Sequence, residues 1–231
     1  MNPHFKIVTT TGKAAALGGF FIFHSLSSYH LNISQQEILA IVAGASFAAG
    51  LNVYATIATL GLLSRVHVFQ LPPALHLIDS WVVIGVAGLL FVLEFFADKI
   101  PVFDLIWNGL NTFVRVPVAA FLAWGATQHL SLVAQLLMTV LASLIALTAH
   151  GGKTAVRAAV TPSPEPFSNI ALSLGEDVIA VGLTWLATQH PVAAAVIVGI
   201  AVLAAIVTIR AIWRAIKKLF TLSEPEIPPA V

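Results

Sequence analysis

Four acidic residues of this chain lie inside or beside long apolar runs, where a carboxylate is unusual: Glu94, Asp98, Glu176 and Asp177. Glu94 and Asp98 are four positions apart, so a helix would place both side chains on one face. Ionisable groups within a membrane-spanning segment are costly and mark functional sites by default. Carboxylates in such a place can bind protons or cations.

A set of basic residues is spaced to meet these acids. His150, Lys153 and Arg157 follow an i, i+3, i+7 pattern, which forms one stripe if the helix continues through the two intervening glycines. Arg115 would enter from the start of another helix. Charges inside a helix bundle pair with one another where they can. We therefore expect an acid–base network of these side chains at the cytoplasmic end of the bundle.

A purely structural interpretation of the same charges is also open. Ser173 and Glu176 match a capping box, which would put Asp177 in the first turn of a helix, where the helix dipole favours anions. Both acids would then lie at the surface. Lys153 and Arg157 would in that case be topology determinants that contact anionic lipid. This interpretation predicts salt bridges without a binding role.

Other kinds of site have little support. Four carboxylates suit hard cations such as magnesium or calcium, but the neighbouring lysine and arginine side chains would already neutralise them. The 8 histidines show no pair four residues apart, and the chain has 0 cysteines and no GxSxG motif. An enzyme acting on lipid phosphates would use the basic stripe, with the acids as general bases. We expect no metal, no cofactor and no catalytic residue, and prefer a non-enzyme.

The composition decides which class of protein must hold these charges. Of 231 residues, 58% are hydrophobic and 9% are charged, with a formal net charge of +1. Soluble domains carry about 25% charged residues, so this chain has too little charge to coat a soluble surface. An ordinary soluble enzyme, a disordered protein and a nucleic-acid binder are excluded. The chain is predicted to be an all-α integral membrane protein.

The apolar runs predict the spans that position the charges, because a helix needs about 20 apolar residues to cross the hydrocarbon core. Six segments qualify or come close: Ile38 to Ser64, Trp81 to Ala97, Phe113 to Ala126, Leu132 to Ala149, Ile170 to Ala187 and Val192 to Ile212. The third is short unless the stretch from Val102 to Thr112 supplies its entry. Ala14 to Phe23 is predicted to be an interfacial or re-entrant helix, with a seventh span as the alternative.

Lysine and arginine set the orientation of the spans, because short cytoplasmic loops are enriched in them. Arg210, Arg214, Lys217 and Lys218 place the C-terminal end in the cytoplasm. Six spans then leave only Arg65 outside, if the N-terminal segment does not cross. The prediction is a multi-pass protein with a cytoplasmic C-terminus.

Two weak self-matches occur in the same order along the chain. Residues 49–58 align with residues 149–158, and residues 93–101 align with residues 183–191. They predict two units of three helices, a 3+3 repeat in which the odd number of spans inverts the second unit. The predicted organisation is an N-terminal interfacial segment, two membrane units and a disordered tail, at residues 1–34, 35–130, 131–218 and 219–231.

The two predicted units have glycines at matching places in their first helices. One stretch is Gly50-Leu51-Asn52 and the other is His150-Gly151-Gly152. Interrupted helices at matching positions point to the binding site of a transporter, which adds Asn52 to the candidate residues. The alternative is that Gly50 allows close helix packing, while Gly151 and Gly152 end a helix.

Several charged and proline-rich strings occur at spacings that are specific as a set: LEFFADKIP with the later Asp104, TFVRVP, HGGKTAVR, SPEPFSN and SLGED. Through these strings the chain resembles a bacterial family of integral membrane proteins of unknown function, over about Ile38 to Arg210. The resemblance implies the bacterial inner membrane as the location. It supplies no activity or substrate.

Two functions fit these observations. The first is a small transporter or channel for an unknown small solute or ion, with Glu94 and Glu176 as proton or cation sites between the inverted repeats. The second is a non-transporting scaffold or regulatory membrane subunit, in which the charges form a satisfied network. In either case we expect the lipid bilayer as a partner, a homo-oligomer and no nucleic acid.

Overall fold

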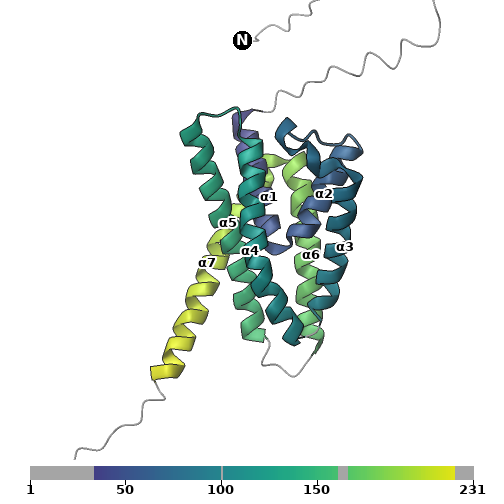
Figure 1. Ribbon diagram of the computed structural model, residues 1–231. Helices are drawn as coiled ribbons and strands as arrows, with labels where there is room; N and C mark the ends of the chain where they lie inside the picture. Colours follow the sequence, from purple (N-terminus) through teal and green to yellow (C-terminus); the bar gives the residue numbers. More distant parts are fainter. Residues whose placement is uncertain (1–33, 100, 161–165, 222–231) are drawn as a thin grey trace, which may run out of the picture. The chain divides into compact units, whose positions relative to one another are not determined.

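The computed structural model describes residues 34–99, 101–160 and 166–221, which belong to one unit of the chain. These residues form only helices, and no strand occurs among them (Figure 1). The predicted all-α class is therefore confirmed. The predicted N-terminal interfacial helix, the connector at 161–165 and most of the tail lie outside the described residues.

The described helices are α1 (Gln35–Leu51), α2 (Val53–Arg65), the 3-10 helix η1 (Pro73–Asp79), α3 (Trp81–Ala97), α4 (Pro101–Ala126), α5 (Leu132–Val160), α6 (Pro166–Gln189) and α7 (Pro191–Thr221). Three of them contain stretches long and apolar enough to cross a membrane: Leu132–Arg157, Ile170–Gln189 and Pro191–Lys218. A fourth is added if η1 and α3, bent by 61° at their junction, form one span. The helices are compatible with a membrane protein, but they do not confirm six spans in a 3+3 repeat.

The predicted span from Ile38 to Ser64 is two helices rather than one. Asn52 lies between them in an extended conformation, with φ −147° and ψ 103°. Its backbone N–H donates to the Ala48 carbonyl at 2.9 Å, and its side-chain oxygen accepts from the Ala55 N–H at 2.9 Å. One residue thus ends α1 and caps α2, a role for which asparagine is among the best side chains. One continuous helix from Ile38 to Ser64 is therefore not present, and the interruption that the Gly50-Leu51-Asn52 stretch predicted occurs at Asn52.

The two halves fold back on each other as a hairpin, so the start of α1 and the end of α2 lie at the same end of the bundle (Figure 1). Near the start of α1, Val42 packs against Ala123 of α4. Farther along α4, Gly125 lies against Leu75 of η1, and η1 also lies against Gly61 near the end of α2. The tip of this α1–α2 hairpin therefore lies inside the bundle.

Small residues let the hairpin pack closely against its surroundings. α1 contacts α4, α5, α6 and α7. A Cβ atom added to Gly44 would lie 2.5 Å from the Cβ of Ala187, and one added to Gly50 would lie 2.7 Å from the Cβ of Ala149. Neither position has room for a side chain, which confirms the packing interpretation of Gly50.

The glycines of the second predicted unit behave differently. α5 continues from Leu132 to Val160 without a break, so Gly151 and Gly152 neither interrupt nor end it. The predicted helix end was therefore wrong, and only the first of the two glycine stretches stands beside an interruption. Gly152 instead faces Ala205 of α7, where an added Cβ would lie 2.9 Å from the alanine Cβ.

Two further helix starts bear on the predictions. α4 begins at Pro101, so the stretch before Phe113 belongs to the same helix, but α4 is not among the helices that are apolar enough to cross a membrane. α6 begins at Pro166, which makes Ser173 and Glu176 interior residues of a helix. The predicted capping box was wrong because proline at the first position had already started the helix about two turns earlier.

The outer surface of α7 is apolar. Its residues Val196, Ile200, Leu203 and Val207 are 59% to 66% exposed and lie at helical spacing on one face. A stripe of large exposed hydrophobic side chains of this length suits contact with lipid tails rather than with water.

Candidate functional site

Charged side chains from four helices converge around the tip of the α1–α2 hairpin. We call them the buried charge cluster: Glu94 and Asp98 at the end of α3, Arg115 of α4, His150, Lys153 and Arg157 of α5, and Glu176 and Asp177 of α6. None of these residues is more than 9% exposed, and Asn52 at the tip is fully buried. All nine candidate residues thus lie together. Their role in binding stays a prediction.

Arg115 is the most deeply buried of the charged residues and joins three elements. Its Nη2 donates to Glu94 Oε1, and both side chains are 0% exposed. Its Nη1 donates to Nδ1 of His150 at 2.7 Å and to the carbonyl oxygen of Gly50 at 3.4 Å. The guanidinium therefore pairs with a carboxylate and also contacts the last turn of α1, where unsatisfied carbonyls favour a cation.

The hydrogen bonds fix the protonation of His150. A guanidinium can only donate, so Nδ1 facing Arg115 must accept and carry no proton. The Nε2–H then donates to Thr112 Oγ1 at 2.7 Å, and the Thr112 hydroxyl donates to the Asn108 carbonyl at 3.1 Å. His150 is thus a neutral imidazole that extends the network along α4, rather than a fourth positive charge.

In the rest of the cluster, two basic side chains from α5 lie between three carboxylates from α3 and α6. Lys153 Nζ lies 2.9 Å from Glu176 Oε2 and 3.8 Å from oxygens of both Glu94 and Asp98. Arg157 Nη2 lies 2.7 Å from Asp98 Oδ2 and 2.7 Å from Glu176 Oε2. Such shared pairing compensates the cost of burying each ion, since several opposite charges surround every one of them.

The cluster also holds the tip of the hairpin. Lys153 Nζ donates to the Leu51 carbonyl, the last residue of α1, at 3.3 Å. The Asn52 amide donates from Nδ2 to Asp177 Oδ1 at 2.8 Å. Because the end of α1 carries partial negative charge and the start of α2 partial positive charge, a cation at the first and an anion at the second are both favourable.

Asp177 differs from the other three acids of the cluster. Glu94, Asp98 and Glu176 each have at least one ion pair with a base, whereas Asp177 has none among the described residues. Its Oδ2 atom is buried and, like Glu94 Oε2 and Asp98 Oδ1, has no hydrogen-bond partner in the part of the chain that the structure describes. Asp177 is therefore the one carboxylate of the cluster that has no ion pair among the described residues, although the charge of Lys153 still acts on it.

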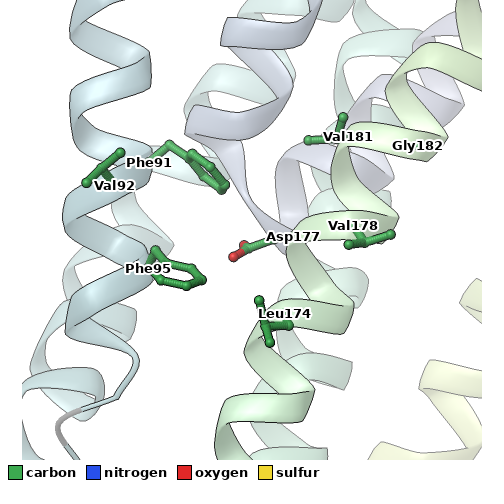
Figure 2. A pocket seen from close by; sticks show the side chains of 8 residues that line it. All are labelled: Phe91, Val92, Phe95, Leu174, Asp177, Val178, Val181 and Gly182. Carbon is green, nitrogen blue, oxygen red and sulfur yellow. The ribbon is translucent and has the colours of Figure 1, made fainter.

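A groove of about 580 Å³ lies beside this carboxylate, between α3 and α6. Phe91 and Phe95 of α3 form one wall, and Leu174, Val178 and Val181 of α6 form much of the other. Figure 2 shows the Asp177 side chain pointing from α6 into the space between the two helices, toward the phenyl rings. The groove thus has apolar walls and one acidic group.

Two polar contacts were not found from the sequence. Ser173 Oγ donates to Asp98 Oδ2 at 3.0 Å, and Tyr54 OH donates to Asn111 Oδ1 at 2.9 Å. Asn111 lies four residues before Arg115, a spacing that places both on one face of α4 and was available as a signal. Ser173 was interpreted as a helix cap, and nothing in its local sequence pointed to α3.

The arrangement does not resemble a metal centre. Among the described residues, no group of three or more histidine, aspartate or glutamate side chains is placed to hold a metal ion. The carboxylates instead surround Lys153 and Arg157, which occupy the positions that a cation would need.

One family model matches the chain over residues 39–211, and its description is "Domain of unknown function (DUF4126)". The matched range contains the hairpin, the whole buried charge cluster and the groove. No curated protein and no solved structure matches the chain.

Proposed function

Because this chain belongs to the DUF4126 family, a domain of unknown function, we propose its function from the site itself. We infer an integral membrane protein that moves a small solute or ion past a re-entrant hairpin, with the buried charge cluster as its binding site. The observation that carries this proposal is the position of Asp177. A carboxylate without an ion pair among the described residues lies on α6 beside the tip of a half-length hairpin, inside a bundle of apolar helices.

The proposed topology has five crossing helices, α3 to α7, and the α1–α2 hairpin entering from one side. Basic residues support an orientation with the end of α7 in the cytoplasm, since Arg210, Arg214, Lys217 and Lys218 lie there and Arg65 lies at the opposite end of the bundle. With the family resemblance, this favours the bacterial inner membrane. α1 then begins on the other side, because an odd number of crossings follows it.

The proposed topology is not an inverted repeat, because an even number of crossings in the first unit makes both units start on the same side of the membrane. Residues 35–130 would supply a re-entrant hairpin and two crossing helices, and residues 131–218 would supply three crossing helices. What supports a site at the interface between the units is the pairing across it. Arg115 and Glu94 come from the first unit, and they contact His150 and Lys153 of the second.

Broken helices near the middle of a membrane are a recurrent way to build a transport site, because their free carbonyls and N–H groups bind ions and substrates. Here the end of α1 offers carbonyls at Gly50 and Leu51, which Arg115 and Lys153 contact. A permeating cation would compete with these side chains for the same carbonyls and for Asp177. Binding would thereby loosen the tip, which is the coupling that alternating access requires.

Cysteine labelling tests the proposal directly, because the chain has 0 native cysteines. Single cysteines at Asn52, His150 and Asp177, with one at the lipid-facing Leu203 as control, would be exposed to a membrane-impermeant maleimide on each side of oriented vesicles. Labelling at 52 and 177 indicates a water-filled path to the tip. If neither is labelled, the cluster is dry and the transport proposal fails.

A scaffold or regulatory subunit is the second candidate, and the density of ion pairs favours it. Arg157 and Lys153 each bridge more than one carboxylate, as expected of a cluster that only holds helices together. This alternative predicts that charge variants lower the abundance of the protein and do not change a rate. Variants with normal abundance and altered flux would contradict it.

A further inference from the structure

The groove between α3 and α6 has a chemistry of its own. Its walls are apolar and aromatic, and the outer residues Leu174, Val178 and Val181 are 41% to 70% exposed. In a membrane these exposed side chains would face lipid tails, so the groove opens sideways into the bilayer. A solute that enters it needs an apolar body.

The Asp177 carboxylate at the inner side of the groove favours a ligand that carries a positive charge. Asp177 is 7% exposed, and its Oδ2 has no partner among the described residues. The Asn52 amide satisfies only the other oxygen, Oδ1. A buried acceptor without a partner costs free energy, and the cost is larger for a charged group. Because that oxygen is buried, the Asp177 side chain must turn toward the groove before a ligand with a positively charged N–H group can satisfy it and neutralise the carboxylate.

The aromatic wall suits the same ligand. Phe91 and Phe95 lie on the side toward which Asp177 points (Figure 2). The ring of Phe95 already interacts with a cation, since the Lys99 ammonium lies over its face. Phenyl faces attract ammonium groups through the ring quadrupole, and the attraction is larger away from water.

We propose that this groove binds an amphiphilic organic monocation, an ammonium group on an apolar or aromatic body, which enters from the bilayer and pairs with Asp177. The inference rests on the proposed function, because it names the class of solute that the buried charge cluster would receive. It commits to a cation and not to a lipid tail alone, because a tail would leave the Asp177 oxygen without a partner.

Photolabelling of the protein in lipid nanodiscs tests this. The probe is 4-benzoylbenzylamine, a photoreactive aromatic cation. Its neutral analogue 4-benzoylbenzyl alcohol and the anion 4-benzoylbenzoate have the same apolar body. Peptide mass spectrometry would locate the labelled residues. We expect the amine to label residues 91–95 of α3 or 174–182 of α6 at least about tenfold more than either analogue, as expected for a hydrogen bond to a charged group.

Two variants make the result specific. Asp177→Asn keeps the shape of the groove and removes the charge, so amine labelling should fall to the level of the alcohol. Gly182→Leu adds an apolar side chain to the lining of the groove, and no atom lies within 4 Å of the Cβ it would add. It should block all labelling there, even if Asp177→Asn folds poorly. Asp79→Asn on η1 is the matched control and should leave labelling unchanged.

The outcomes separate the two proposals. Equal labelling by amine and alcohol, or amine labelling that persists in Asp177→Asn, would show that lipid-like partitioning fills the groove, and would overturn the inference. That result leaves transport through the tip to the cysteine experiment. Charge-dependent labelling together with unlabelled cysteines at both positions 52 and 177 would support the groove as a site and overturn transport alone.

Discussion

Lys153 Nζ donates to the carbonyl oxygen of Leu51 at 3.3 Å, although the two residues are 102 positions apart in the chain. Leu51 is the last residue of α1, whose final carbonyls have no partner within the helix. The same ammonium contacts Glu176 at 2.9 Å. The position of the hairpin tip and the pairing of the cluster are therefore linked through one side chain, and a change in either must act on the other.

The Arg115–Glu94 pair should be essential to folding in a way that a double variant can reveal. Arg115→Met leaves Glu94 buried without its closest partner, so the free energy of unfolding should fall by about 3–5 kcal/mol. Adding Glu94→Gln removes the orphaned charge and should recover part of the loss. Denaturant titration in detergent measures both. Additive losses in the double variant would contradict a direct pair.

Variants of the adjacent acids Glu176 and Asp177 should show that the first carboxylate serves mainly stability and the second mainly function. Glu176→Gln weakens the contacts with Lys153 and Arg157, so it should lower the melting temperature clearly. Asp177→Asn breaks no described ion pair and should melt close to the wild type while losing solute binding or flux. Thermal unfolding and vesicle flux would be measured on both variants. A melting temperature equally lowered in Asp177→Asn would assign this carboxylate to the structural network.

The convergence of the charges was predictable, and the path of the backbone around them was not. The i, i+3, i+7 stripe of α5 and the Glu94–Asp98 spacing of α3 follow from helical periodicity, which sequence displays directly. The hairpin depends on Asn52 acting as a cap, but asparagine also occurs in unbroken membrane helices, where its side chain hydrogen-bonds to a neighbouring helix. Gly151 and Gly50 both predicted an interrupted helix. However, α5 continues past Gly151, and the neighbouring Gly152 packs against Ala205 of α7.

The sequence also could not predict that Asp177, unlike Glu176, has no ion pair among the described residues. Glu176 and Asp177 are neighbours, and a pattern cannot decide which of two adjacent carboxylates faces the bases. The direction in which α6 turns decides it: Glu176 faces Lys153 and Arg157, and Asp177 faces Asn52 and the groove. That direction is set by packing along the whole helix, which depends on residues far apart in the chain.

Glycine substitutions should distinguish close packing from free space. Gly50→Ala would place a Cβ 2.7 Å from the Cβ of Ala149 and against the backbone of α5, so the hairpin must shift. We expect a loss of about 1–3 kcal/mol, the usual cost of overpacking. Gly85→Ala on α3, where nothing lies within 4 Å, is the control and should be as stable as the wild type. Equal effects at the two positions would mean that the hairpin does not need its close approach to α5.

Asn52 should be replaceable only together with its partner. Asn52→Ala removes the cap of α2, a loss of about 1 kcal/mol, and also leaves Asp177 Oδ1 without its donor. Asn52→Asp keeps an acceptor for the Ala55 N–H but puts two carboxylates together, so it should be less stable still. The exchange Asn52→Asp with Asp177→Asn restores one amide and one carboxylate.

This exchanged pair should recover most of the stability lost in Asn52→Asp, because the hydrogen bond that Nδ2 now makes across the tip can form in the opposite direction. Its binding of a cation in the groove should stay lost, since the carboxylate has moved from α6 to the hairpin tip. Denaturant titration would follow stability, and amine photolabelling would follow binding. Recovery of both would show that the groove needs only a nearby negative charge, while recovery of neither would show that the tip and α6 are not coupled through this bond.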